Sequence, residues 1–247
     1  MVAAHESDSK GIAMRNLLVV TVITILIPLV ANRLTAGDSG DGFISLFNGK
    51  DLSGWMYKGS QENLAGKTET ADKRFAVENG AIVAREGKGI KDLYALKSFD
   101  KDFQLKLEFR ASLKSDSGVY VRGSQLQVRD YVRRNERPQL KGKFKDDDWN
   151  ALDITVKAGV VVSKVNGKTL TETDSFELSV RNGKPSAKLN GKEVEARDIS
   201  VKNAVIASCL CNGVHIEDMT VPATGGIGVQ AESGKFEFRN IRVREIR

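Results

Sequence analysis

Cysteine, histidine, proline and aromatic residues are all scarce in this chain of 247 residues. It has two cysteines, two histidines and four prolines, and aromatic residues make up 6% of it. Two cysteines cannot build a disulfide scaffold, and Cys209 and Cys211 lie too close along an expected strand to bond each other comfortably. Multi-cysteine zinc sites and chemistry that needs several histidines are therefore excluded. An apolar fraction of 40% against 28% charge argues against disorder.

Long apolar runs are also scarce, and the one that stands out lies near the N-terminus. It extends from Leu17 to Ala31, follows Arg15 and precedes the small residue Ala36. At about 15 residues it matches the core of a secretory signal peptide and is shorter than a comfortable membrane span. We expect residues 14–36 to be a signal peptide cleaved near Ala36, and residues 1–13 to be an extension before the true start. The mature protein is then secreted or periplasmic, without a stable membrane span; an N-terminal membrane anchor is the alternative.

The net charge of +6 comes almost entirely from one segment. Residues 129–145 contain seven basic and two acidic residues, and the rest of the chain after the leader is close to neutral. Aromatic residues are not interleaved with these basic residues, so we predict no nucleic-acid partner. The segment begins on an expected strand, which predicts a basic rim that favours an anionic or enolate-bearing ligand.

A two-residue hydrophobic period dominates the chain from Phe43 onward. Alternation is clearest over residues 103–110, 119–122, 125–129, 151–156 and 227–243. Six Asn-Gly pairs supply turns that tolerate positive φ, and no long segment has the helical period. The pattern predicts an all-β sandwich of two antiparallel sheets.

An internal repeat interrupts this pattern. Residues 154–170 align without gaps on residues 178–194 and share the motif Asn-Gly-Lys. We expect a duplicated hairpin that lengthens a sheet edge, inserted at about residues 159–203 into a domain of residues 42–247; a separate binding unit is the alternative.

Several expected strands carry outward side chains that suit a ligand. If the strands near residues 106, 120 and 127 are neighbours, these side chains form one patch of donors and acceptors. Planar amides, guanidinium groups and a tyrosine ring match sugar hydroxyls beside a flat apolar surface. A plain hydrated sheet face is the alternative. The outward residues are Lys106, Glu108, Arg110, Tyr120, Arg122, Gln125, Gln127 and Arg129.

Other motifs are weaker. Asp146–Asp148 lacks the spacing of a calcium loop and is expected to be a solvated turn. His215 has no visible partner, and Gly225–Gly228 does not open a helix, which argues against a phosphate loop. The sequence predicts no cofactor and no metal ligands, and leaves a divalent cation open.

An ordered series of motifs resembles a known family. The series reads FISLFNGKDLSGW at 43–55, FAVENGAI at 75–82, SGVYVRG at 117–123, QVRD at 127–130, GIGVQ at 226–230 and FEFRNI at 236–241. These motifs resemble the 3-keto-disaccharide hydrolase family, also described as 3-keto-glucoside lyase/2-hydroxyglucal hydratase domains. The resemblance covers Phe43 to Ile246 apart from the repeat, and it implies a secreted, concanavalin-like (LamG-like) jelly roll that acts on a glycoside or oligosaccharide.

The resemblance also implies a chemistry. A ketone at C3 acidifies the C2 proton, so a base can remove it, the C1 oxygen leaves by β-elimination, and water then adds. The resemblance and the face assignment together suggest catalytic roles for Glu108 and Asp130 as acid or base and for Arg110 and Arg122 as oxyanion stabilisers. The expected substrate-binding residues are Tyr120, Gln125, Gln127, Arg129, Trp149 and Gln230, with a core position as the alternative for Trp149.

Two departures from the family pattern matter. Gln125 stands where the family commonly has a glutamate, and an amide cannot act as a base. The short basic stretch from Tyr131 to Lys145 replaces a Gly-Ala-Ile/Leu-Tyr stretch. Two hypotheses follow: an enzyme that cleaves 3-keto-glycosides, and a non-catalytic glycan-binding module.

Overall fold

The computed structural model describes residues 41–171, 173–181, 184–195 and 199–246. The expected N-terminal extension and signal peptide lie outside these residues. Within them, no helix is long and apolar enough to cross a membrane, and the one helical element is a 3-10 turn at Pro138–Leu140.

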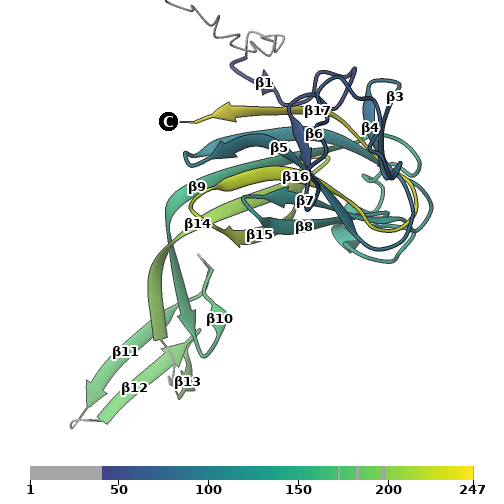
Figure 1. Ribbon diagram of the computed structural model, residues 1–247. Coiled ribbons are helices and arrows are strands. Elements are labelled where there is room, and N and C mark those ends of the chain that lie inside the picture. Colours follow the sequence, from purple (N-terminus) through teal and green to yellow (C-terminus); the bar gives the residue numbers. More distant parts are fainter. Residues whose placement is uncertain (1–40, 172, 182–183, 196–198, 247) are drawn as a thin grey trace, which may run out of the picture. The chain divides into compact units, whose positions relative to one another are not determined.

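The described chain folds into antiparallel sheets (Figure 1). The largest has nine strands in the order β15-β14-β9-β6-β17-β4-β3, with β1 on β17 and β10 on β9. A second sheet has the order β2-β5-β16-β7-β8, and a small one the order β11-β12-β13.

The strand bounds are as follows. The nine-stranded sheet contains β1 (Ile44–Ser45), β3 (Phe75–Glu78), β4 (Ala81–Ala84), β6 (Phe103–Ala111), β9 (Asn150–Val165), β10 (Lys168–Thr169), β14 (Ile199–Cys211), β15 (Val214–Val221) and β17 (Phe236–Glu245). The five-stranded sheet contains β2 (Trp55–Tyr57), β5 (Lys91–Phe99), β7 (Asp116–Val121), β8 (Ser124–Arg129) and β16 (Gly225–Ala231). The small sheet contains β11 (Phe176–Arg181), β12 (Lys184–Leu189) and β13 (Lys192–Val194).

The core lies between the nine-stranded and five-stranded sheets. Alternate residues of β6, such as Leu105 and Phe109, are buried against Val119 and Val121 of β7 and Leu126 of β8. Each fully buried side chain of this size contributes about 1.5–3 kcal/mol relative to an exposed one. The prediction of an all-β jelly-roll sandwich of two antiparallel sheets is confirmed.

Both cysteines belong to this core. Cys209 and Cys211 are buried free thiols on one side of β14, two residues apart. In a strand, residues at this spacing point the same way, too far apart for a bond. The prediction that they do not pair is confirmed.

The sandwich separates the strands that were expected to form one polar patch. β6 belongs to the nine-stranded sheet, whereas β7 and β8 belong to the five-stranded sheet. Because the inward residues of all three strands share one core, Glu108 and Arg110 lie on one outer face and Tyr120 and Gln125 on the opposite one. The prediction of a single contiguous patch is therefore wrong. A two-residue period tells which residues point outward but not to which sheet their strand belongs.

The two copies of the repeat adopt different conformations. The first copy continues as the 16-residue strand β9, whereas the aligned second copy forms the antiparallel pair β11 and β12. Only the Asn-Gly turns match: φ is 49° and 79° at Asn166 and Gly167, and 52° and 76° at Asn190 and Gly191. Each turn joins a strand to a short partner, β9 to β10 and β12 to β13. Both copies therefore form a short hairpin at the Asn-Gly turn and differ in the residues before it.

Candidate functional site

The outer face of the five-stranded sheet is polar and partly buried. Tyr120 on β7 and Gln230 on the neighbouring β16 are buried, at 9% and 2% exposed, whereas Gln125 on β8 is exposed. A plain hydrated face would leave such side chains in water, so other side chains must cover them. We call this surface the tyrosine–glutamine face; its central residues are Asp92, Tyr94, Tyr120, Gln125, Gln127 and Gln230.

Strand register brings these residues into two adjacent rows. In the first row, Gly228 lies between Tyr94 and Tyr120, and Tyr120 is opposite Gln125. In the second row, Asp92 is opposite Gln230, and the neighbouring strands place Gly118 opposite Gln127.

Two glycines make room for the larger side chains of these rows. A Cβ on Gly228 would lie 2.9 Å from Cδ1 of Tyr94, and a Cβ on Gly118 would lie 2.4 Å from Nε2 of Gln125. Because neither glycine has a Cβ, the rings of Tyr94 and Tyr120 can stack with centroids 5.1 Å apart, and the Gln125 side chain can lie across β7. Glycine in a strand interior often marks such a close approach.

A hydrogen-bond network joins the two rows. Tyr120 donates its hydroxyl hydrogen to Oδ1 of Asp92 over 3.1 Å, and Nε2 of Gln230 donates to the Tyr120 oxygen over 2.6 Å. Nε2 of Gln125 donates to Oε1 of Gln230 over 2.9 Å. Each amide is thereby held in one orientation, and the face presents a fixed set of donors and acceptors.

Lys58 brings a positive charge to this network from the end of β2. Its Nζ lies 3.2 Å from Oδ2 of Asp92 and 5.5 and 5.7 Å from the ring centres of Tyr94 and Tyr120. The Lys58 side chain is 60% exposed and that of Asp92 is 13% exposed. The carboxylate therefore lies deeper in the face than the lysine that pairs with it.

The tyrosines of the face remain protonated at neutral pH. Burial raises the pKa of Tyr94 to about 12. Burial, followed by the negative charge of Asp92, also raises the pKa of Tyr120. Both hydroxyls are therefore hydrogen-bond donors under ordinary conditions.

The far end of the face is held by ion pairs. The amide of Gln127 donates to Asp116 and, over 3.2 Å, to Oε2 of Glu232. Nε of Arg129 donates to Oδ1 of Asp116 over 2.9 Å, and its Nη1 lies 3.2 Å from Glu136. Arg129, expected to bind substrate, is thus already engaged by two carboxylates.

The other arginines of the basic segment are also paired. Arg133 contacts Asp130 over 2.7 Å and Asp147 over 2.6 Å, and Arg137 pairs with Glu217. These ion pairs attach the segment to the sandwich and neutralise much of its charge. The predicted basic rim is correspondingly weaker than the sequence indicated.

The structure does not place Arg122 or Asp130 on the tyrosine–glutamine face. The buried guanidinium of Arg122 donates to the carbonyl of Lys101 over 2.5 Å and packs on Phe103, and burial lowers its pKa. Asp130 is fully buried, and its Oδ2 accepts from the backbone N–H of Lys114 over 2.6 Å. Both side chains were expected to act on a substrate, but each is bonded to groups of the protein itself.

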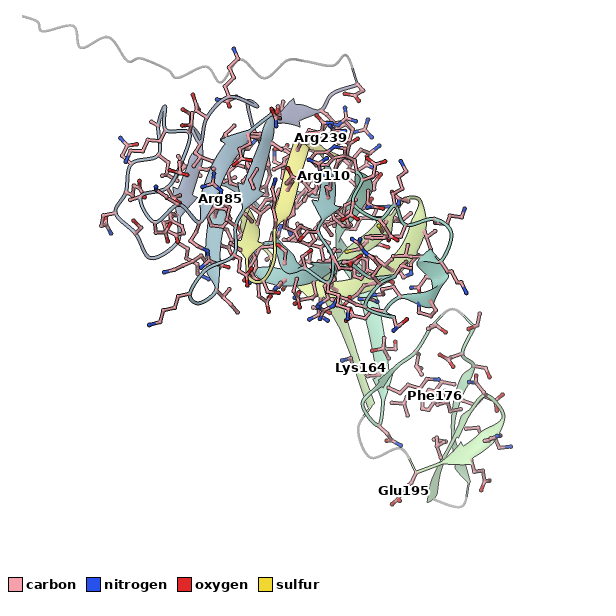
Figure 2. The ribbon with its side chains drawn as sticks, turned by 90° about the vertical axis from the view of Figure 1, so that its right-hand side faces the viewer. Arg85, Arg110, Lys164, Phe176, Glu195 and Arg239 are labelled. Carbon is pink, nitrogen blue, oxygen red and sulfur yellow. The ribbon has the colours of Figure 1, made fainter. Side chains whose placement is uncertain are left out.

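Three further predicted residues, Glu108, Arg110 and Trp149, gather on the opposite outer face, where Figure 2 labels Arg110 and Arg239. Nε of Arg239 donates to Oε2 of Glu108 over 2.6 Å, and Arg110 forms two hydrogen bonds with Glu237. The ring of Trp149 lies against both guanidinium groups: its centre is 3.9 Å from Cζ of Arg239 and 4.8 Å from Cζ of Arg110. Trp149 is also partly exposed and lies outside the core.

Sequence reasoning missed Asp92, Tyr94 and Lys58. Asp92 and Tyr94 alternate with the buried Leu93 and Ala95, so the period-two pattern could have identified them as outward residues. Lys58 follows a strand of three residues and carries no such signal.

No metal site accompanies this network in the part of the chain that the structure describes. None of its groups of three or more histidine, cysteine, aspartate or glutamate side chains could hold a metal ion. Asp146 and Asp147, in the acidic turn, lie near Arg133.

The sandwich belongs to a family of carbohydrate-active domains. The model of the family described as 3-keto-alpha-glucoside-1,2-lyase-like domain matches residues 42–244, and the chain therefore belongs to that family. The resemblance found in the sequence is confirmed.

Solved structures with a similar fold include two bacterial proteins. A protein from Parabacteroides distasonis ATCC 8503, provisionally described as a glycosyl hydrolase, is 18% identical; the match covers 84% of this chain and 95% of that one, with a TM-score of 0.44. The carbohydrate-binding module CBM66 from Bacillus subtilis is 11% identical over 78% of this chain and 96% of that one, with a TM-score of 0.32. No curated protein matches the chain.

Proposed function

We propose that the protein cleaves 3-keto-glycosides on the tyrosine–glutamine face. The observation that carries this proposal is the contact of Asp92 with Tyr120, Gln230 and Lys58 in a partly buried polar network. Family membership supports the substrate class, and the fixed amides and stacked tyrosines suit sugar hydroxyls and a sugar ring.

The proposed reaction begins beside the ketone. A carbonyl at C3 acidifies the C2–H bond, and the Asp92 carboxylate removes that proton. The electron pair forms an enolate, whose oxygen is stabilised by the Lys58 ammonium group and by amide donors. When the enolate collapses, a C1–C2 double bond forms and the C1–O bond breaks.

A single carboxylate can serve both halves of the reaction. C1 and C2 are adjacent, so the protonated Asp92 can return its proton to the departing oxygen and release the alcohol. Water then adds across the double bond, with its hydroxyl at C1 and a proton at C2, which completes a net hydrolysis. Tyr120 remains protonated and orients Asp92 through their 3.1 Å hydrogen bond.

A non-catalytic glycan-binding module is the second candidate. Gln125, an amide on the edge strand β8, reaches Gln230, and the carboxylates of the face are already engaged in hydrogen bonds or ion pairs. Such a face could bind a glycoside without abstracting a proton.

The proposal also includes export of the protein through residues 14–36. N-terminal sequencing of protein recovered outside the cytoplasm is expected to begin near Gly37. Recovery of the intact N-terminus in the membrane fraction would instead support an anchor.

A chromogenic 3-keto-glucoside separates the two candidates. The full chain should release the aglycone with transient enone absorbance, and Asp92→Asn should lower kcat at least 100-fold with little change in KM. Tyr120→Phe should lower kcat about tenfold, within the usual range for general acid–base groups. Glu245→Gln, an exposed carboxylate elsewhere, is the matched control and should keep full turnover.

Each outcome decides between assignments. Substrate binding without any product would support the glycan-binding module. Full turnover in Asp92→Asn together with lost turnover in Glu108→Gln would move the chemistry to the opposite sheet and overturn the assignment of Asp92.

A further inference from the structure

A groove of about 610 Å³ crosses the outer face of the nine-stranded sheet, opposite the tyrosine–glutamine face. One wall follows a single row of paired residues across five strands. The row runs from Ser45 on β1 through Arg242, Lys106 and Asp153 to Leu210 on β14. Because neighbouring strands lie about 4.8 Å apart, this row is roughly 19 Å long.

The next row along the strands forms the other wall and the floor. Glu108 is paired with Ala151, while Asn240 and Gly213 line the two ends. Ala151 and Gly213 are exposed and small, which leaves space in the groove where neighbouring positions carry long side chains. A β-bulge between Arg239 and Arg242 turns Asn240 so that its amide donates to Oε2 of Glu108 over 3.0 Å.

The polar groups of the groove are balanced in charge. Lys106 and Arg242 supply two cations, and Glu108 and Asp153 supply two carboxylates. Lys106 lies 3.5 Å from Asp153. Adjacent donors and acceptors of this kind match the vicinal hydroxyls of a sugar, whereas a polyanion would meet both carboxylates.

We propose that this groove binds a neutral oligosaccharide chain at a second site, separate from the tyrosine–glutamine face. A groove that spans five strands contacts several consecutive sugar rings, while a single ring would use only part of either wall. The partly exposed Trp149 packs on Arg239, which is hydrogen-bonded to Glu108, and extends the contact surface at that side. The site holds an oligosaccharide on the protein surface and takes no part in bond cleavage.

The test measures binding of unmodified sugars to the full chain by calorimetry. The probes are glucose hexasaccharides with β-1,4, β-1,3 or α-1,4 linkages, which lack the ketone that the proposed reaction needs. At least one should bind, and the disaccharide of the same linkage should bind at least tenfold more weakly. The double variant Lys106→Ala/Asp153→Ala should weaken hexasaccharide binding at least tenfold.

A matched control removes a similar ion pair outside the groove. Lys101→Ala/Glu245→Ala deletes a surface pair whose atoms lie 3.3 Å apart, and its affinity should stay within twofold of the wild type. All four positions are at least partly exposed, so the variants are expected to fold, which circular dichroism verifies.

The inference is independent of the proposed function. Asp92→Asn should lower kcat at least 100-fold and leave hexasaccharide affinity unchanged. The inference is overturned if no hexasaccharide binds, if Lys106→Ala/Asp153→Ala binds like the wild type, or if Asp92→Asn loses the hexasaccharide. Tighter binding of a uronate hexasaccharide than of any neutral one would overturn it as well.

Discussion

At the residue scale, Gly118 decides how Gln125 is placed. Its missing Cβ lets the Gln125 side chain lie across β7 and reach Gln230. A larger residue at position 118 would force the Gln125 amide away from the network. The polar surface therefore depends on an absent side chain as much as on those present.

We expect Gly118→Ala and Gln125→Ala to be energetically coupled. In the wild type, Gly118→Ala should cost about 1–2 kcal/mol, because the new Cβ would lie 2.4 Å from Nε2 and 2.8 Å from Cγ of Gln125. In the Gln125→Ala background the same change should cost almost nothing. Urea unfolding of the four proteins measures the coupling. Strict additivity would show that Gln125 does not occupy the space above Gly118.

At the element scale, the paired strands β9 and β14 flank one continuous stretch of the chain, which contains β10 to β13. The two strands pair from Leu152–Cys211 to Val165–Ile199, where Val165 and Ile199 are direct partners. The chain between that last pair contains β10 and the small sheet. A short turn from Val165 to Ile199 could therefore join β9 to β14 without β10 or the small sheet.

We predict that Asn-Gly can replace residues 166–198. A two-residue type I′ turn suits antiparallel strands that end in a direct pair, so the shortened protein should fold, with a thermal midpoint within a few degrees of the wild type. Its turnover should also be retained, because no part of the tyrosine–glutamine face is removed. Circular dichroism melting measures the midpoint.

A matched variant closes the same gap with Ala-Ala. Alanine disfavours the positive φ that both turn positions need, so this variant should be less stable than the Asn-Gly one. Loss of folding in both would show that the deleted segment is required by the sandwich.

At the scale of the whole molecule, the reactivity of the two cysteine thiols indicates whether the sandwich is intact. Cys209 and Cys211 lie in the core between the two large sheets. Burial raises the pKa of each thiol to about 12, so almost no thiolate exists at pH 8. Reaction of either thiol requires the sheets to separate.

Neither thiol should react with an aromatic disulfide reagent at pH 8 in the native protein, and both should react in denaturant. The rate in intermediate denaturant should follow global unfolding measured by circular dichroism. Rapid reaction of one thiol in native buffer would instead reveal local opening of β14.

Much of the fold could be predicted from sequence periodicity. The alternation in β6 identified its buried residues, and the Asn-Gly pairs identified turns such as Asn79-Gly80 and Asn212-Gly213, where φ is positive at both residues. These signals are local, since each depends on residues a few positions apart.

The candidate site was less predictable. Tyr120, Gln125, Gln127 and Gln230 do gather on one face, but Arg122, which alternation also placed there, is turned inward. Arg122 has a φ of 51° at the start of the β7–β8 turn, so the strand period ends before it.

By itself, the sequence determined the all-β class, the turns, the unpaired cysteines and the family, because these depend on composition, short-range pattern and ordered motifs. Only the tertiary structure decided that Glu108 and Tyr120 lie on opposite faces, that Lys58 reaches Asp92, and that the basic segment is neutralised by distant carboxylates such as Glu217. The physical reason is that strand pairing and ion pairs join residues far apart in the chain, and no local pattern specifies those partners.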